Sequence, residues 1–224
     1  MDLNKIFWNI YGKYAWDQLH LPVEQKVINT VVNLIKLQRK FAVEKILDAG
    51  CGTGKYALPL AEEGFHVTGI DYSTGMLEFA RSKIAVELSE RITFERMDMN
   101  SRLDFTDAEF DHVISISSLW AVSDPHYTLT EFSRILKPSG TFVVMQIPSP
   151  ANNLFKVIKT RIKFLVNRTP LNMLLIAVKA ILERTSATRY WTQDELLFLI
   201  LGNKDFRVTY IDPGPPILIV ATKK

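Results

Sequence analysis

Three glycines occupy alternate positions directly after a short apolar run, and this pattern constrains the fold more than any other feature of the chain. The apolar run is followed by Asp48, and the glycines are Gly50, Gly52 and Gly54. Glycine lacks a Cβ atom, so it adopts backbone angles that other residues avoid and lets a ligand approach the main chain closely. The sequence after Gly54 has a helical pattern. We therefore predict a strand, a tight turn and a helix, with room for a nucleoside cofactor at the turn.

Three known loop patterns compete for these glycines, and their spacing separates them. The phosphate loop G-x-x-x-x-G-K-[ST] could end at Gly54 and Lys55, but positions 49 and 56 are alanine and tyrosine, which do not fit it. The dinucleotide pattern G-x-G-x-x-G fails in the register that begins at Gly50. The register that uses Gly52, Gly54 and Ala57 is weakened but stays open. The third pattern, acid-x-G-x-G-x-G, is matched at every position.

Three later strand-like segments also lead to a polar residue. They are residues 65–70 before Asp71, residues 92–97 before Asp98, and residues 110–116 before Ser117. Strand-like and helical patterns alternate along the chain, which is typical of parallel strands joined by crossover helices. In such sheets, ligands bind at the carboxyl ends of the strands, near the point where the strand order reverses. We therefore expect one rim of the sheet to gather these polar residues together with Asp48.

With this loop and these strand ends, the chain resembles the class I S-adenosylmethionine-dependent methyltransferases over residues 42–147. The resemblance implies S-adenosylmethionine as the cofactor and S-adenosylhomocysteine as the product. It implies that Asp71 binds both ribose hydroxyls, which suits a carboxylate because it accepts two hydrogen bonds. Asp98 would accept from the adenine amino group, and Met76 would pack on adenine. The cofactor-binding residues that the resemblance implies are Asp48, Gly50, Cys51, Gly52, Gly54, Asp71, Tyr72, Met76, Asp98, Met99 and Ser117.

The order of the segments predicts an α/β fold with one Rossmann-like, doubly wound sheet. We expect seven strands, mostly parallel, with an antiparallel last strand and a helical lid insertion. A single methyltransferase domain would cover residues 1–224. Its expected parts are an N-terminal helical cap (1–40), a cofactor-binding core (42–147), a basic helical lid (151–190), and a C-terminal helix with edge strands (191–224).

Local signals mark two helix starts and one hairpin. Asp124 before Pro125 is typical of a helix N-terminus, with the acid as the cap and the proline in the first turn. Thr192 and Glu195 have the spacing of a capping box. The proline-rich residues 213–216 predict a turn between the last two strands, as in an antiparallel hairpin at the sheet edge.

Composition limits the alternatives. The chain has 224 residues, 47% of them hydrophobic, which suits one domain with a substantial core. Cys51 is the one cysteine, so a disulfide framework or a cysteine-based zinc site within one chain is excluded. The four histidines show no metal-ligand spacing, and we predict no metal. The first residues lack the apolar run of a signal peptide, so we expect a cytoplasmic protein.

The segment 151–190 departs from a minimal methyltransferase domain through its charge. It has eight Lys or Arg and one Glu, a balance of +7, whereas the rest of the chain has 19 basic and 23 acidic residues, a balance of −4. Three interpretations stay open: a lid with a solvated basic face, a surface that contacts an anionic membrane through residues 151–184 and admits a lipid-like substrate, and a nucleic-acid patch. We disfavour nucleic acid, because the segment has only three aromatic residues for stacking: Phe155, Phe164 and Tyr190.

Two regions supply candidates for catalysis. The aromatic-rich residues 8–17 resemble the opening of many small-molecule methyltransferases, which folds over the cofactor; a packed helix without ligand contact is the alternative. The resemblance implies in-line displacement at the sulfonium methyl group, and oxygen or carbon acceptors generally need a base. We predict His126 and Tyr14 for this role, with Asp124 and Tyr11 as further candidates. The residues expected near the transferred methyl group are Ser117, Ser118 and Trp120.

These patterns together predict an S-adenosylmethionine-dependent methyltransferase that acts on a small acceptor, and a lipid-like acceptor is among the possibilities. Neither the acceptor nor the oligomeric state follows from the sequence. Two competing functions remain. The first is a non-catalytic regulatory protein that binds S-adenosylmethionine. The second is an NAD-type oxidoreductase, which would use the alternative glycine register.

Overall fold

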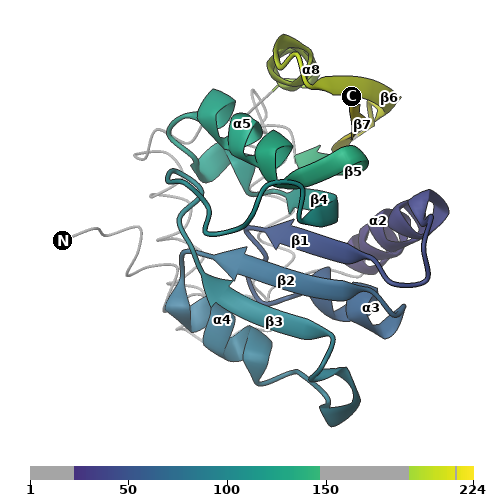
Figure 1. The fold of residues 1–224 in the computed structure, drawn as a ribbon, viewed down its shortest axis with the longest axis vertical. Helices are drawn as coiled ribbons and strands as arrows, with labels where there is room; N and C mark the ends of the chain where they lie inside the picture. The colour runs from purple at the N-terminus through teal and green to yellow at the C-terminus, as the bar shows by residue number, and fades with distance from the viewer. Residues whose placement is uncertain (1–22, 147–191, 215) are drawn as a thin grey trace, which may run out of the picture.

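A computed structural model describes residues 23–146, 192–214 and 216–224 of the chain, and within them seven strands form one sheet. The strands are β1 (Lys45–Ala49), β2 (His66–Asp71), β3 (Ile92–Arg96), β4 (Phe110–Ile116), β5 (Leu136–Gln146), β6 (Phe206–Asp212) and β7 (Ile217–Lys223). Their order across the sheet is β3-β2-β1-β4-β5-β7-β6. Strand β7 runs antiparallel to both of its neighbours, and the other pairs are parallel. This sheet confirms the predicted fold class (Figure 1).

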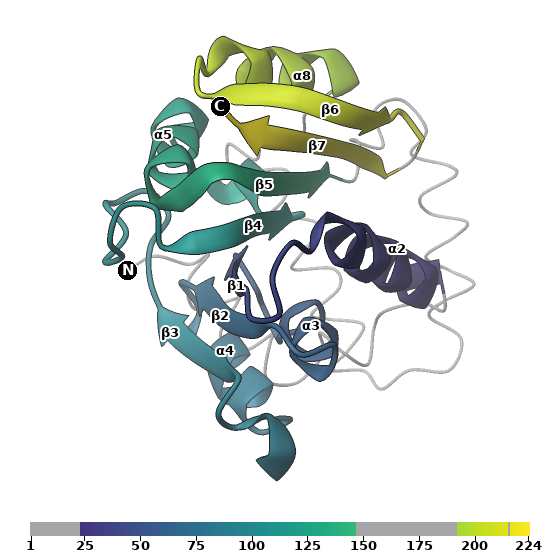
Figure 2. The same ribbon diagram turned by 45° about the vertical axis from the view of Figure 1, so that its right-hand side comes forward.

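Helices cover both faces of the sheet. They are α2 (Val23–Gln38), α3 (Ala57–Glu62), α4 (Thr74–Arg81), α5 (Pro125–Ile135) and α8 (Gln193–Gly202), with short 3-10 turns η1 (Val86–Leu88) and η2 (Leu119–Ala121). One apolar core lies between the sheet and α2, α3 and α4, and the other lies between the sheet and α5 and α8 (Figures 1 and 2). Strand β4 is buried along its whole length because it lies mid-sheet between these cores, and the burial includes three polar residues, Asp111, His112 and Ser115.

The strand order reverses between β1 and β4. From β1 the chain moves outward through β2 to β3, and it then returns to place β4 on the other side of β1. The loops that leave β1 and β4 therefore diverge, and ligands of open α/β sheets bind at such a point. The topology thus places the expected site between the carboxyl ends of these two strands.

The local signals for helix starts and the hairpin are confirmed. The Oδ1 atom of Asp124 accepts from the main-chain N–H groups of His126 and Tyr127, both at 3.0 Å. Thr192 and Glu195 form the reciprocal bonds of a capping box at the start of α8. Strands β6 and β7 pair as an antiparallel hairpin at the sheet edge.

Two predicted segments fall largely outside the described residues. These are the aromatic start of the N-terminal cap (1–22) and the whole basic lid (151–190). The remainder of the predicted cap is mostly α2, which packs against the sheet. The proposed division of the domain into cap, core and lid stays a prediction.

Candidate functional site

The glycine loop between β1 and α3 has the backbone conformation that its sequence requires. Gly50, Gly52 and Gly54 have φ angles of 78°, 54° and 75°, which lie in the left-handed region. A Cβ atom on Gly50 would lie 2.3 Å from Cβ of Ser118, and one on Gly54 would lie 2.7 Å from Cζ of Phe94. Among the residues that the structure describes, none has an atom within 4 Å of a Cβ atom built on Gly52. Two of these glycines therefore serve packing as well as conformation, whereas Gly52 borders open space that a ligand can enter.

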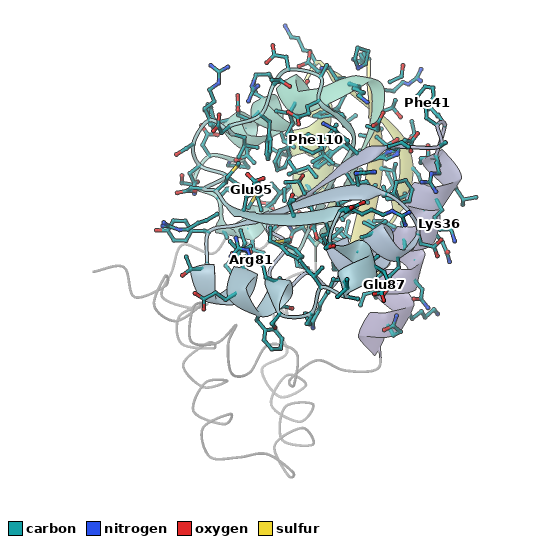
Figure 3. The ribbon with its side chains drawn as sticks, turned by 60° about the horizontal axis from the view of Figure 1, so that its bottom comes forward. Lys36, Phe41, Arg81, Glu87, Glu95 and Phe110 are labelled. Carbon is teal, nitrogen blue, oxygen red and sulfur yellow. The ribbon has the colours of Figure 1, made fainter. Side chains whose placement is uncertain are left out.

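Contacts with β2 and α4 hold the glycine loop in place. The main-chain N–H groups of Gly50 and Cys51 both donate to the carbonyl oxygen of Ile70, at 2.8 and 2.9 Å. Arg81, labelled in Figure 3, reaches from α4 to β3, where it donates to the carbonyl oxygen of Phe94. The ring of Phe94 in turn occupies the space next to Gly54. The loop is thus held on a rigid support, which favours precise positioning of a ligand.

Asp71 ends β2 directly beside the glycine loop. Its Oδ2 atom accepts from the Gly52 N–H group at 2.9 Å, and its Oδ1 atom accepts from the Ser73 N–H group at 2.8 Å. Burial raises the pKa of Asp71, and main-chain hydrogen bonds from Ser73, Gly52 and Tyr72 partly offset this effect. A carboxylate has about four lone-pair sites. Asp71 therefore keeps acceptor capacity for a pair of vicinal hydroxyl groups.

Asp48 is a buried carboxyl with an unsatisfied oxygen. Only 1% of the residue is exposed, and within the described part of the chain its Oδ2 atom has no hydrogen-bond partner. Burial and, to a smaller extent, the nearby charge of Asp71 raise the pKa of Asp48 to about 8. A hydrogen bond from the Ala57 N–H group acts in the opposite direction and lowers this pKa. Leaving a buried carboxylate unpaired is costly. The site therefore suits a ligand that brings positive charge.

The structure places the other predicted cofactor residues around these two acids. Met76 is 3% exposed in the first turn of α4, where its N–H group donates to Oγ of Ser73 at 3.2 Å. Met99 is half-buried, with its Cε atom 3.4 Å from the position of a Cβ atom on Gly50. Cys51 is buried, and burial raises the pKa of its thiol well above the ordinary value, so little nucleophilic thiolate forms.

Ser117 and Ser118 connect the end of β4 to the glycine loop. Ser117 has a φ angle of 53°, a strained conformation for a residue with a side chain, and its carbonyl oxygen accepts from Nε1 of Trp120 at 2.7 Å. The Oγ atom of Ser118 donates to the carbonyl oxygen of Ala49 at 2.7 Å. Strained backbone is typical of functional sites. The end of β4 is therefore joined directly to the glycine loop, and the role of Ser117 toward an acceptor stays a prediction.

The turn after β3 contains a hydrogen-bond network that the sequence analysis missed. Asp98 accepts at Oδ1 from the N–H group and the Nδ2 atom of Asn100, at 2.9 and 2.8 Å. The Oδ1 atom of Asn100 accepts from the N–H group and Oγ of Ser123, at 2.6 and 2.7 Å. An acid followed two residues later by an amide is a local signal for such a turn. No sequence pattern indicated the bond to Ser123, because that residue is distant along the chain.

The predicted catalytic residues are not brought together in the described part of the chain. His126 lies in the first turn of α5 and is exposed, and none of the described residues forms a hydrogen bond with its ring. Asp124 acts as the cap of the same helix. Tyr11 and Tyr14 lie outside the described residues. The roles of His126 and Tyr14 therefore remain predictions.

The described residues contain neither a cluster of metal ligands nor a helix that could cross a membrane. Within residues 23–146 and the C-terminal part that the structure describes, no group of three or more His, Cys, Asp or Glu side chains could hold a metal ion. In the same residues, every helix is too short or too polar to cross a membrane.

The fold and the site define a Rossmann-like α/β domain with a nucleoside-cofactor site at the strand-order reversal. Comparison with known proteins narrows this class. Residues 47–144 match the family model described as a methyltransferase domain. This core of the chain is therefore similar to the methyltransferase-domain family, and it makes up less than half of the 224 residues.

Individual proteins agree with the family match. A demethylmenaquinone methyltransferase from Clavibacter sepedonicus is 38% identical over 109 residues, which are 49% of this chain and 43% of that protein. A ubiquinone/menaquinone biosynthesis C-methyltransferase from Geobacter sulfurreducens is 33% identical over 128 residues, which are 55% of this chain and 50% of that protein. The structure of a magnesium protoporphyrin IX methyltransferase from Synechocystis with bound S-adenosylhomocysteine has a TM-score of 0.70 at 17% identity, covering 99% of each chain.

These comparisons confirm the resemblance to class I methyltransferases and S-adenosylmethionine as the cofactor. The residues present fit this cofactor, because Gly52 leaves open space beside the loop, Asp71 keeps lone pairs for a diol, and Asp48 suits a cationic ligand. The chain spans half or less of the length of the two curated relatives named above. The acceptor and the activity of the whole protein are therefore matters for proposal.

Proposed function

We propose that this protein transfers the methyl group of S-adenosylmethionine to a carbon atom of a small, apolar, quinone-type acceptor. The observation that carries the methyltransferase part is the cradle at Gly52, where Asp71 accepts from the loop N–H group beside open space. The names of the relatives support the acceptor class, because they describe methylation of demethylmenaquinone and carbon methylation in quinone biosynthesis. They are statements about those proteins, and the experiment below tests this one.

The residues of the chain would divide the work of binding and alignment. Asp71 would accept hydrogen bonds from the two ribose hydroxyls, and Asp98 would accept from the adenine amino group. A cationic ligand nearby would lower the pKa of Asp48, and the buried carboxylate that forms would then balance the positive charge of the ligand. When bound, S-adenosylmethionine supplies an electrophilic methyl group on a cationic sulfonium. Ser117 and Trp120, at the end of β4, would border the acceptor, so that its carbon atom lies in line with that methyl group.

Carbon methylation of an aromatic acceptor requires the removal of a proton. An aromatic hydroxyl makes its ring carbons more nucleophilic once it is deprotonated, so a base is needed near the acceptor. We keep His126 for this role because it lies in the first turn of the helix that follows the β4 loop. Tyr14, which lies outside the described residues, is the second candidate. A bell-shaped or sigmoidal pH profile that His126→Gln abolishes would support the histidine.

An apolar acceptor would be dissolved in a membrane, so we also propose that the protein contacts a membrane. Quinone-type molecules partition into bilayers, and the charge balance of +7 in residues 151–190 suits an anionic surface. That segment lies outside the described residues. We therefore propose peripheral contact through residues 151–184 on the basis of sequence alone. The regulatory alternative stays open as the second candidate function, because it needs the same cofactor site without an acceptor.

The decisive experiment measures transfer of radiolabelled methyl from S-adenosylmethionine to a reduced demethylated naphthoquinone. A polar catechol serves as the alternative acceptor, and Asp71→Ala serves as the control. Label in the organic extract that depends on Asp71 supports the proposal. Label only on the catechol would overturn the acceptor class. The regulatory alternative would be favoured if the protein bound S-adenosylhomocysteine but transferred no methyl group, either to the reduced naphthoquinone or to any acceptor in a lysate.

A further inference from the structure

Asn100 makes four hydrogen bonds that join two separate loops on the cofactor side of the sheet. Its N–H group and its Nδ2 atom both donate to Oδ1 of Asp98, in the turn that follows β3. Its Oδ1 atom accepts from the N–H group and the hydroxyl of Ser123, in the loop between η2 and α5. The four distances lie between 2.6 and 2.9 Å. The side-chain amide of Asn100 thus makes three of these bonds and links the acid to the loop after β4.

The chemistry of these contacts requires an amide. The atoms that face Asp98 are donors, and the atom that faces Ser123 is an acceptor, so a carboxylate or an ammonium group could satisfy one side only. Both donors converge on Oδ1 of Asp98. Its Oδ2 atom accepts no hydrogen bond from the described residues. Asn100 therefore orients the carboxylate and leaves one oxygen available to a ligand.

Orientation matters here because Asp98 is only half-buried. A partly exposed carboxylate can rotate and exchange its partners with water, and this freedom must be lost when a ligand binds. A carboxylate that is already held in one rotamer avoids that cost. It also presents an acceptor in a fixed direction, which distinguishes a ligand that offers an N–H donor from one that offers a carbonyl oxygen.

We propose that Asn100 is a positioning residue that sets the selectivity of the cofactor site for adenine through the hydrogen bond from its side-chain amide to Asp98. This inference rests on the proposed role of Asp98 toward the adenine amino group. Ser123 holds Asn100 in the required rotamer. The selectivity for the base is therefore determined partly by a loop that follows β4 and not only by the turn after β3.

The test compares two ligands that differ at one position of the base. S-adenosylhomocysteine carries the exocyclic amino group, and S-inosylhomocysteine carries an oxygen in its place. Calorimetry on the full chain gives the dissociation constants of both ligands and their ratio. We expect Asn100→Ala to weaken binding of S-adenosylhomocysteine by about 5- to 20-fold and to affect S-inosylhomocysteine much less, as is typical for one lost polar contact. The dissociation constant of S-inosylhomocysteine divided by that of S-adenosylhomocysteine should therefore fall toward one.

A double-mutant cycle separates positioning from a general structural effect. In an Asp98→Ala background, Asn100→Ala should change neither dissociation constant by more than about 2-fold, because the group through which it acts is gone. Ser101→Ala is the matched control, since its side chain belongs to the same turn and is exposed. Ser123→Ala should give a smaller fall in the ratio than Asn100→Ala, because the main-chain bond to Asn100 remains. Thermal unfolding verifies that each variant is folded.

Each outcome distinguishes this inference from the proposed function. The positioning role would be overturned if Asn100→Ala weakened binding of both ligands equally. It would also be overturned if Asn100→Ala changed the dissociation constants as much in the Asp98→Ala background as in the unsubstituted chain. Both outcomes would leave the methyltransferase proposal in place. If Asp98→Ala itself leaves the ratio unchanged, the adenine role of Asp98 is wrong and the inference fails with it. If the unsubstituted chain binds neither ligand, the proposed function fails first.

Discussion

Asp71 is the residue whose removal should affect cofactor affinity most, because its carboxylate bonds to the glycine loop and keeps lone pairs for the expected ribose. We expect Asp71→Ala to weaken binding of S-adenosylhomocysteine by about 1.5 to 3 kcal/mol, the loss expected for hydrogen bonds to a charged group. That corresponds to about 10- to 150-fold in the dissociation constant, measured by calorimetry. Glu95→Ala is the matched control, because Glu95 is an exposed acid on β3 (Figure 3). Unchanged affinity of Asp71→Ala would contradict the ribose role.

Asp48 should make the ligand-free protein less stable as the pH rises. Burial and the charge of Asp71 raise its folded-state pKa to about 8 from the ordinary 3.8. Between these values the folded state binds more protons than the unfolded state, so the free energy of unfolding falls as the pH increases. Asp48→Asn removes this proton and with it the dependence. We expect the melting temperature of Asp48→Asn, relative to the unsubstituted chain, to be higher at pH 8.5 than at pH 5. A constant difference across this range would show that Asp48 ionises normally.

At the scale of single residues, the sequence was most informative where a backbone conformation or a charge pattern is local. The left-handed glycines and the acids at the strand ends could be predicted because each follows a short apolar run. Phe94 and Asn100 could not be predicted as parts of the site. Their roles depend on contacts with Gly54 and Ser123, which other elements of the fold supply.

The loop between β1 and α3 should respond differently to substitution at two of its glycines. Gly54→Ala meets the Phe94 ring at 2.7 Å and retains a left-handed φ angle, so it should lower stability by about 2 to 4 kcal/mol. Gly52→Ala meets no atom of the described residues and should lower stability by only about 1 to 2 kcal/mol. Its methyl group would instead occupy the open space beside Asp71. We therefore expect Gly52→Ala to lose ligand affinity and Gly54→Ala to lose stability.

Denaturant unfolding and calorimetry on both variants test this division. The free energy of unfolding should fall more for Gly54→Ala, and the dissociation constant of S-adenosylhomocysteine should rise more for Gly52→Ala. The reverse order would mean that the open side of Gly52 does not face the ligand.

Elements with local start signals were predictable, and their arrangement in space was less so. The helix caps at Asp124 and Thr192 each depend on four or fewer consecutive residues, so the local sequence is enough to predict them. The proline-rich turn similarly indicated the β6–β7 hairpin. The neighbour relations β1–β4 and β5–β7 depend on contacts between distant segments. The sequence patterns predicted parallel strands with an antiparallel last strand, and they did not predict these neighbour relations.

At the scale of the whole molecule, we expect the proposed cofactor site to unfold together with the sheet. The proposed residues lie at the ends of β1, β2 and β4 and in the turn after β3, and β1, β2 and β4 contribute to both apolar cores. A ligand that binds only the folded state stabilises such a unit by mass action. At a concentration 100 times its dissociation constant, S-adenosylhomocysteine should add about 2.7 kcal/mol to the free energy of unfolding.

For a domain of this size, that increase corresponds to a rise of about 5 to 10 °C in the melting temperature. NAD at the same concentration should give no rise, because this chain has Lys55 where the dinucleotide pattern that begins at Gly50 requires its third glycine. Scanning calorimetry with each ligand, repeated on Asp71→Ala, separates specific binding from a general effect of the added compound. A rise with NAD that equals the rise with S-adenosylhomocysteine would revive the oxidoreductase hypothesis, since the register through Gly52, Gly54 and Ala57 would then bind a dinucleotide.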